Sequence, residues 1–166
     1  MTTGQLKEQL QNKLIISVDP DDTIFMLTSI LLEHSCNVEA FISDYETAKY
    51  YKDIFTYNNK HNHIKFYHGL LGSTHQTSHN KNIPETYTLD HLKYTKPVFI
   101  IYTNSDLVND VILGALGTIN TCNPFIFVKN KSIQKYNDTI TLLKNYSSIT
   151  IDNFTIYTPS SFKRNH

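Results

Sequence analysis

The sequence predicts an α/β fold, a Rossmann-like three-layer arrangement around a mostly parallel sheet of about five strands. Short apolar runs such as 14–18 and 97–102 alternate with longer segments of helical periodicity. Continuous apolar runs suit strands that are covered on both faces, as in a parallel sheet. Their alternation with helices favours a doubly wound sheet with right-handed crossovers. The chain has 166 residues, of which 40% are hydrophobic, so a single core and a single domain over residues 1–166 are expected.

The first half of the chain predicts three strands joined by two helices. Each strand is a short apolar run, and each helix carries its apolar residues at helical spacing. The predicted elements are a polar helix or tail at 1–12, strands at 14–18, 38–43 and 64–67, and helices at 23–34 and 45–57.

The second half continues the pattern after a polar interruption. Residues 70–85 show no apolar period, so they predict a long polar loop, and loops of this length in compact domains are often functional. The elements predicted after it are helices at 89–94, 107–119 and 131–145, strands at 97–102 and 124–128, and a terminal hairpin at 149–157.

Composition excludes several classes of partner. Fifteen basic residues balance fifteen acidic ones, which argues against non-specific nucleic-acid binding through a basic excess. No apolar run approaches the roughly 20 residues that span a bilayer, and the start of the chain lacks the apolar stretch of a signal peptide. We therefore expect a cytoplasmic protein with a small-molecule substrate, no nucleic acid and no membrane, with homo-oligomers left open. The bias toward Asn, Lys, Ile and Tyr indicates an AT-rich genome, such as that of a virus, where the compartment would be the host cytoplasm.

The chemistry-bearing feature of the sequence is an acidic turn directly after the first strand. This turn reads Asp19-Pro20-Asp21-Asp22. In open α/β sheets, ligands bind outside the carboxyl ends of the strands, so these carboxylates stand where a site is expected. Carboxylates this close together repel one another unless a cation or hydrogen-bond donors hold them. The turn therefore predicts either a helix cap, which Asp and Pro favour, or a metal or catalytic site.

The segment Val18-Asp19-Pro20-Asp21-Asp22-Thr23 resembles the A-H-P-D-D-E signature of the LmbE/PIG-L family of zinc-dependent de-N-acetylases. The resemblance extends in pattern over roughly residues 13–120. It implies a metal-dependent hydrolase that removes an acyl group from an N-acyl amino sugar or a similar substrate. It also implies that Asp21 is the general base that activates a metal-bound water.

The same resemblance places the three metal ligands at Asp19, Asp22 and Asp110, with Asn109 as the alternative to the last. The family has histidines at the first and last of these positions. An all-oxygen ligand set suits magnesium, manganese or calcium, whereas zinc prefers nitrogen and sulfur. The prediction is therefore a divalent metal, zinc by resemblance or a harder ion by ligand type, or no metal at all. In that last case the chain would be an inactive Rossmann-like domain that binds a partner or self-assembles.

Two other families also place acidic residues after the first strand. The haloacid dehalogenase phosphatases carry D-x-D-x-T, which the segment from Asp19 to Thr23 satisfies, with Asp19 as nucleophile and Asp21 as general acid. In that interpretation Thr103 would supply a later phosphate-binding hydroxyl. Nucleoside hydrolases, with D-x-D-P-G-x-D-D, match only with a gap. Phosphatase chemistry therefore ranks third, after the metal-dependent hydrolase and the inactive binding domain.

Histidines gather around the predicted polar loop. His61 and His63, and His75 and His79, have spacings that can share a metal, but no predicted strand or helix would hold them in place. A solvated loop explains them more simply. The alternative is that His75 or His79 reaches over the acidic turn as a proton donor.

Overall fold

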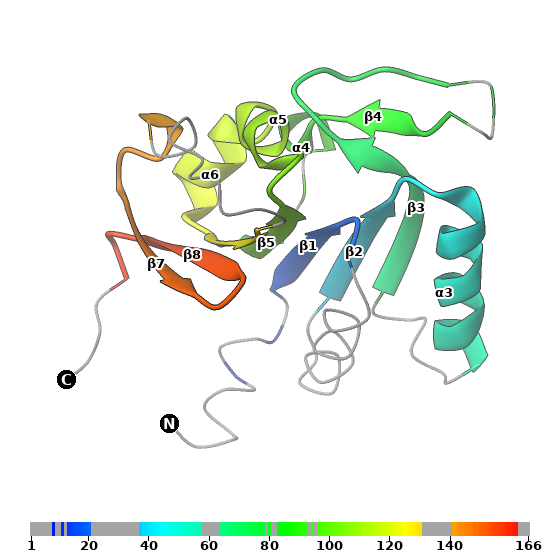
Figure 1. The fold of residues 1–166 in the computed structure, drawn as a ribbon, viewed down its shortest axis with the longest axis horizontal. Helices are drawn as coiled ribbons and strands as arrows, with labels where there is room; N and C mark the ends of the chain where they lie inside the picture. Colours follow the sequence, from blue (N-terminus) through cyan, green and yellow to red (C-terminus); the bar gives the residue numbers. More distant parts are fainter. Residues whose placement is uncertain are drawn as a thin grey trace.

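A computed structural model describes residues 8, 11, 13–20, 37–57, 64–78, 80, 83–92, 94, 96–130 and 141–162 (Figure 1). Its strands are β1 (Leu14–Val18), β2 (Asn37–Ile42), β3 (Ile64–Leu71), β4 (Glu85–Tyr87), β5 (Val98–Asn104), β6 (Phe125–Lys129), β7 (Tyr146–Ile151) and β8 (Phe154–Pro159). Its helices are α3 (Tyr45–Tyr57), α4 (Leu89–Leu92), α5 (Val108–Leu113) and α6 (Leu116–Cys122).

The strands form one sheet in the order β4-β3-β2-β1-β5-β6-β8-β7. All neighbours from β4 to β6 pair in parallel, while β8 runs antiparallel to both β6 and β7. The prediction of a Rossmann-like α/β fold with a mostly parallel sheet is confirmed. The predicted number of strands is wrong, because the sheet has eight strands in the part of the chain that the structure describes, rather than about five. Strand β4 has only three residues, and β7 is exposed from Ser147 onward, so neither carries a continuous apolar run.

The two faces of the sheet build separate hydrophobic clusters. All five residues of β1 are buried. Successive side chains of a strand point to opposite faces. Accordingly, Leu14, Ile16 and Val18 join one cluster and Ile15 joins the other. Burial on both faces explains why the central strands have the mostly apolar sequences from which they were predicted.

Different helices cover the two faces (Figure 1). Helix α3 contributes Ala48 and Phe55 to the cluster that contains Ile15. The short helices α4, α5 and α6 cover the other face through residues such as Leu89 and Ile112. The sheet is therefore the middle of three layers.

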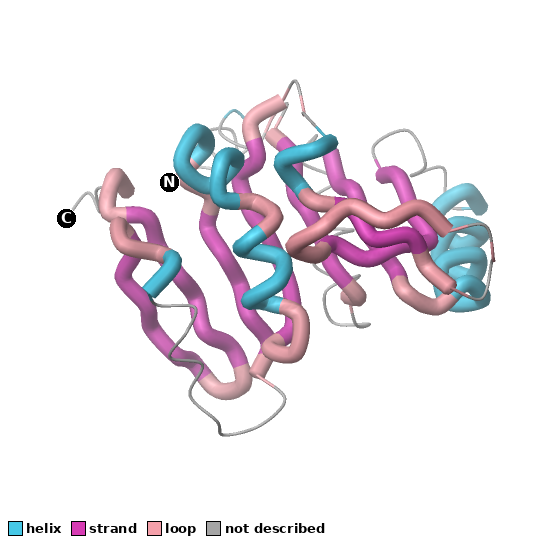
Figure 2. The backbone as a smooth tube through the Cα atoms, turned by 90° about the horizontal axis from the view of Figure 1, so that it is seen from above, coloured by secondary structure: helices cyan, strands magenta, loops and turns pink. Residues whose placement is uncertain are grey.

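The predicted polar loop at 70–85 contains regular structure at both ends. Strand β3 continues to Leu71, and β4 begins at Glu85. Between them the chain leaves the sheet edge and returns beside β4, where Gln76 and Thr86 form an antiparallel bridge (Figures 1 and 2). The pairing is short, so no period of apolar residues marks it in the sequence.

Gly114 joins this region to the helical layer. A Cβ atom at this position would lie 1.9 Å from the carbonyl oxygen of Gly72. The Gly114 carbonyl accepts a hydrogen bond from the Asp90 backbone N–H at 3.0 Å. The close backbone approach therefore requires glycine at the junction between α5 and α6.

Candidate functional site

The candidate site is the edge of the sheet at the carboxyl ends of β1, β2 and β5. From β1 the chain continues to β2 on one side of the sheet, while β5 is the neighbour of β1 on the other side. This reversal of strand order is a topological switch point, where open α/β sheets bind their ligands. The register aligns Ser17 with Tyr102, so Asp19 and the turn after β5 lie at the same edge.

Asp19 joins the ends of β1 and β2. Its carboxylate accepts hydrogen bonds from the Ser43 backbone N–H at 2.8 Å and from the Ser43 hydroxyl at 3.0 and 2.8 Å. Its own N–H donates to the Phe41 carbonyl at 2.8 Å. The backbone of Asp19 has φ 43°, in the left-handed region that Asp tolerates better than most residues. Both carboxylate oxygens are thus engaged in holding the strand ends together.

Of the remaining predicted site residues, the structure describes only Asp110. Asp21 and Asp22 lie outside the described residues. Asp110 is an exposed residue in the first turn of α5, where its carbonyl accepts a hydrogen bond from the Gly114 N–H. Among the described residues, no group of three or more His, Cys, Asp or Glu side chains could hold a metal ion.

Asp44 follows β2 and begins α3. Its Oδ2 accepts hydrogen bonds from the Thr47 N–H at 2.8 Å and from the Thr47 hydroxyl at 2.7 Å, an arrangement typical of a helix N-cap. The Thr47 side chain contributes most, and its backbone N–H next, to lowering the pKa of Asp44 below its ordinary value. Asp44 therefore presents an exposed, ionised carboxylate beside the switch point.

A histidine supports the same corner of the sheet from β3. His68 Nε2 lies 3.1 Å from the Ser43 carbonyl oxygen, and the ring of Tyr45 packs edge-on against the His68 ring at 5.5 Å. These contacts connect the ends of β2 and β3. The position of Asp44 is therefore set by three adjacent elements rather than by its own turn.

The turn after β5 lies on the other side of the candidate site. The buried Asn104 accepts hydrogen bonds at Oδ1 from the N–H groups of Asp106 at 3.0 Å and Leu107 at 3.2 Å. The N–H of Ser105 donates to the Lys129 carbonyl at 2.9 Å, which ties this turn to β6. Asn104 thereby ends the strand and leads into α5, and Asp106 lies exposed on the turn. Thr103, proposed above as a phosphate-binding hydroxyl, is fully buried and unsuited to that role.

Of the histidines around the predicted polar loop, the structure describes His68 and His75, and the proposed proton donor over the acidic turn stays a prediction. His75 stacks on His91 at 4.4 Å and contacts the Tyr87 ring at 5.5 Å. His61, His63 and His79 lie outside the described residues.

Sequence reasoning missed Asp44, Asn104 and Asp106 as members of the candidate site. Their signal was present, because each is a polar residue at or just beyond the end of a predicted strand. What the sequence did not show is that the strands ending at Ile42 and Asn104 flank β1 on its two sides. The acidic turn drew attention because its three carboxylates are adjacent in the chain.

Solved structures identify the class of fold. No protein-family model and no curated protein sequence matches the chain. The methyltransferase FkbM from Methylobacillus flagellatus superposes with a TM-score of 0.65 at 10% identity, over 89% of this chain and 44% of that one. A methyltransferase from Geobacter sulfurreducens gives 0.54 at 14% identity, over 95% and 77%. A protein from Clostridium thermocellum, named as an rRNA methylase, gives 0.55 at 11% identity over 94% of both chains.

The chain therefore has the α/β Rossmann-like fold of methyltransferases, and it spans less than half the length of FkbM. This finding corrects the resemblance to the LmbE/PIG-L de-N-acetylases. The predictions of a metal-dependent deacetylase, of a phosphatase and of a resident divalent metal are wrong on the same ground. The error has a physical source, since an acidic turn after the first strand of a doubly wound sheet serves several unrelated chemistries. Among the described residues, no helix is long and apolar enough to cross a membrane.

Proposed function

We propose that this protein is a methyltransferase that uses S-adenosylmethionine as its methyl donor. The observation that carries the proposal is the fold, since the sheet and its covering helices superpose on methyltransferase structures over most of the chain. The donor supplies, when bound, a methyl group on a positively charged sulfur. What this chain contributes is a switch point between β1 and β5, where open α/β sheets bind their ligands.

Asp44 is the residue that we assign to the ribose of the donor. In doubly wound folds an acidic residue at the end of the second strand accepts hydrogen bonds from ribose hydroxyls. Asp44 has that position and is exposed, and its carboxyl, whose pKa the Thr47 hydrogen bonds lower further, is ionised at neutral pH. The Thr47 bonds both go to Oδ2, which orients the carboxylate on a rigid helix start.

The turn after β1 fits a donor without phosphates better than a dinucleotide. Dinucleotide-binding turns are rich in glycine, partly for tight turning and partly so that the backbone can approach a pyrophosphate. This sequence has no glycine between Asp19 and Asp44. The left-handed conformation at Asp19 supplies the tight turn that glycine would otherwise provide. S-adenosylmethionine has no phosphate, so the second role of glycine is not needed.

For the acceptor we propose a small molecule rather than a nucleic acid. The chain has no net charge, whereas nucleic-acid binding depends on basic residues that neutralise phosphates. The comparison with a protein named as an rRNA methylase makes RNA the alternative acceptor to test. Incubation of the protein with radiolabelled donor and either total RNA or a small-molecule extract separates the two. Label that enters only the RNA fraction would contradict the proposal of a small acceptor.

The test of the donor site is calorimetric titration with S-adenosylmethionine and with its product S-adenosylhomocysteine. The variant Asp44→Asn keeps a residue that caps helices well but removes the charge. Because hydrogen bonds to charged groups are worth about 1.5–3 kcal/mol, we expect the substitution to weaken binding about tenfold or more. Asp53→Asn, on an exposed position of α3, is the matched control and should bind as the parent does.

Two results would contradict the proposal. If neither S-adenosylmethionine nor S-adenosylhomocysteine binds to the folded parent protein, the proposed donor site is excluded. Equal affinity in the parent and in Asp44→Asn would leave the donor but remove the role assigned to Asp44. Circular dichroism of each variant verifies that the fold is retained.

A further inference from the structure

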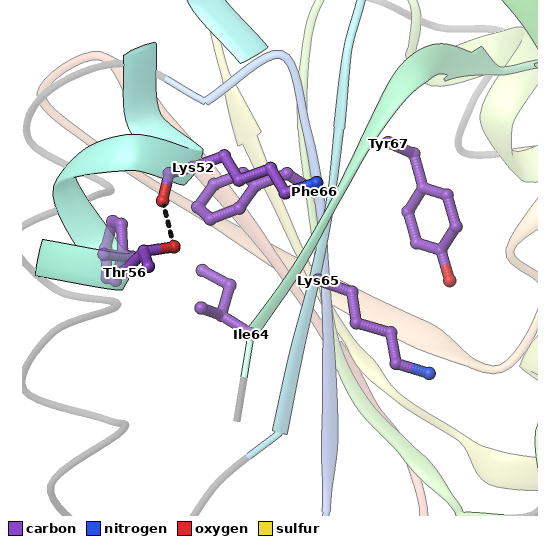
Figure 3. A pocket seen from close by; sticks show the side chains of 7 residues that line it. Lys52, Thr56, Ile64, Lys65, Phe66 and Tyr67 are labelled. Carbon is purple, nitrogen blue, oxygen red and sulfur yellow. Dashed lines mark hydrogen bonds between the residues drawn. The ribbon is translucent and has the colours of Figure 1, made fainter. Parts of the chain in front are cut away.

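His68 of β3 lies beside the residue that we assign to the donor ribose. In the pairing of β3 with β2 it stands opposite Ile42, the last residue of β2. Figure 3 shows Phe66 on the side of β3 that faces α3, with Tyr67 on the opposite side. Because side chains alternate along a strand, His68 belongs to the α3 side. Its ring accordingly packs against Tyr45 at the start of α3, with 5.5 Å between the ring centroids.

The hydrogen bond of His68 determines which ring nitrogen carries a proton. Its Nε2 atom lies 3.1 Å from the backbone carbonyl oxygen of Ser43. A carbonyl oxygen only accepts hydrogen bonds, so Nε2 is the donor. This role is the same for the neutral and for the charged imidazole, because Nε2 carries a proton in both. A side chain that places an N–H group at the same reach can therefore take over the contact.

Ser43 is held from two strands at once. Its N–H and its hydroxyl donate hydrogen bonds to the carboxylate of Asp19, at the end of β1. Its carbonyl accepts the hydrogen bond from His68 of β3. Strands β1 and β3 are the two neighbours of β2 in the sheet. The direction in which the chain leaves β2 toward Asp44 is therefore set from both sides.

This direction matters because the hydrogen bonds of the Asp44 carboxylate are local. The N–H and the hydroxyl of Thr47 orient that carboxylate relative to the first turn of α3. They do not determine where the turn lies relative to the end of β1. The contacts of Ser43 supply this second constraint, and His68 provides the part that comes from β3.

We propose that His68 is a positioning residue for recognition of the donor ribose. By holding the Ser43 carbonyl, it keeps the Asp44 carboxylate where that group accepts the ribose hydroxyls. A site that is competent for only part of the time loses affinity in proportion to the competent fraction. Loss of the His68 contact would therefore weaken binding without removing any group that touches the ligand. The inference rests on the proposed S-adenosylmethionine site and adds the residue that holds its acidic group in place.

The test compares two amides at position 68. In His68→Gln the side-chain amide reaches about as far as Nε2 and can donate to the Ser43 carbonyl, whereas in His68→Asn it is one methylene shorter. Calorimetric titration with S-adenosylhomocysteine measures binding to each variant of the full chain. We expect His68→Asn to bind about threefold or more weakly than the parent, within the range of one hydrogen bond, and His68→Gln to stay within about twofold. The matched control is His91→Ala, at an exposed histidine of α4 that stacks on His75, and it should bind as the parent does.

A second pair of titrations separates positioning from a general loss of structure. If His68 acts through Asp44, His68→Asn should weaken binding by less than about 1.5-fold in the Asp44→Asn background, because the carboxylate that it positions is already gone. A general loss of structure would instead weaken binding by the same factor in both backgrounds. Circular dichroism verifies that each variant is folded during the titration.

The outcomes distinguish this inference from the proposed donor site. If the parent binds S-adenosylhomocysteine and His68→Asn binds it equally well, the positioning role is refuted and the donor site stands. Equal weakening in both backgrounds would also refute the role, because the effect would not pass through Asp44. Failure of His68→Gln to restore affinity would exclude the hydrogen bond to Ser43 as its means. If the parent binds no S-adenosylhomocysteine and no S-adenosylmethionine, the donor site is excluded and the role of His68 is excluded with it.

Discussion

Replacement of Gly114 by alanine tests how the helical layer is joined to the sheet. The new Cβ would lie 1.9 Å from the Gly72 carbonyl oxygen and 3.1 Å from the Gly72 carbonyl carbon, whereas ordinary contacts are 3.4–4 Å. Both of these neighbours are backbone atoms, so no side-chain rotation relieves the clash. The α5–α6 junction and the segment after β3 must move apart by more than 1 Å to reach an ordinary contact.

That movement disturbs specific interactions, and these determine how much stability the substitution costs. It strains the hydrogen bonds from Gly72 N–H to Tyr87 O, at 2.8 Å, and from Asp90 N–H to Gly114 O, at 3.0 Å. Overpacking costs about 1–3 kcal/mol, and each lost hydrogen bond costs about 0.5–1.5 kcal/mol. We therefore expect Gly114→Ala to lower the free energy of unfolding by roughly 2–5 kcal/mol.

The assay is urea denaturation followed by circular dichroism, with Gly117→Ala as the matched control. A Cβ at Gly117 would lie 3.1 Å from the Asp90 carboxylate, a side-chain group that can shift slightly. Alanine is also favoured over glycine inside a helix by about 1 kcal/mol, which offsets this contact. The control should change stability by less than about 1 kcal/mol. If Gly114→Ala costs no more than the control, the close approach of Gly72 and Gly114 is refuted.

Three further predictions concern hydrogen bonds and titration. Asp90 accepts hydrogen bonds at 2.8–2.9 Å from the N–H groups of Gly117 and Thr118 and from the Thr118 hydroxyl. Asp90→Ala should therefore lower the free energy of unfolding by about 0.5–2 kcal/mol, and Asp90→Asn should lower it less. Equal stability of the two variants would contradict this prediction. Ser43→Ala removes the hydrogen bonds from the Ser43 hydroxyl to Asp19 but keeps the one from the Ser43 backbone N–H. The same denaturation assay should show a loss of about 1 kcal/mol of unfolding free energy. An unchanged urea midpoint would argue against the hydroxyl bond. Burial raises the pKa of Tyr67 and of Tyr87 to about 12, from an ordinary value of 10.0. The unfolded phenols ionise first, so these two groups make stability fall as pH rises from about 10 to about 12 and leave it unchanged below that window. The titration of Tyr87 is measured as the phenolate absorbance of the parent minus that of Tyr87→Phe. A difference curve centred at the ordinary tyrosine pKa of 10.0 would disprove the raised pKa of Tyr87.

The methyltransferase-like fold and the deacetylase prediction illustrate what a short motif can establish. The turn from Asp19 to Asp22 follows the first strand, at the edge of the sheet where the candidate site lies. The deacetylase chemistry predicted from this turn was wrong, because the role of a carboxylate depends on the groups that surround it. In the structure the Asp19 carboxylate binds Ser43, a residue at the end of the neighbouring strand.

The elements themselves could be predicted because their cause is local. Strands β1, β2 and β5 are largely buried, so their sequences are mostly apolar, and α3 carries an apolar face at helical spacing. Strand β7 could be predicted only as part of a terminal hairpin, since its exposed residues are mostly polar. Burial leaves a signal in the sequence, whereas backbone pairing at an exposed edge does not.

The order of the strands and the partners of individual side chains were decided only by the tertiary structure. Glu39 lies in a strand that was correctly expected to be buried, yet its carboxylate accepts a hydrogen bond from the Tyr67 hydroxyl of β3 at 3.2 Å. Asp44 and Asn104 meet the switch point from opposite sides of β1 although many residues separate them in the chain. The sequence by itself determined the class of fold, because the class follows from local periodicity, and it predicted a binding edge from the general position of ligand sites in open α/β sheets. Which residues share that edge depends on long-range strand pairing, which local periodicity does not encode.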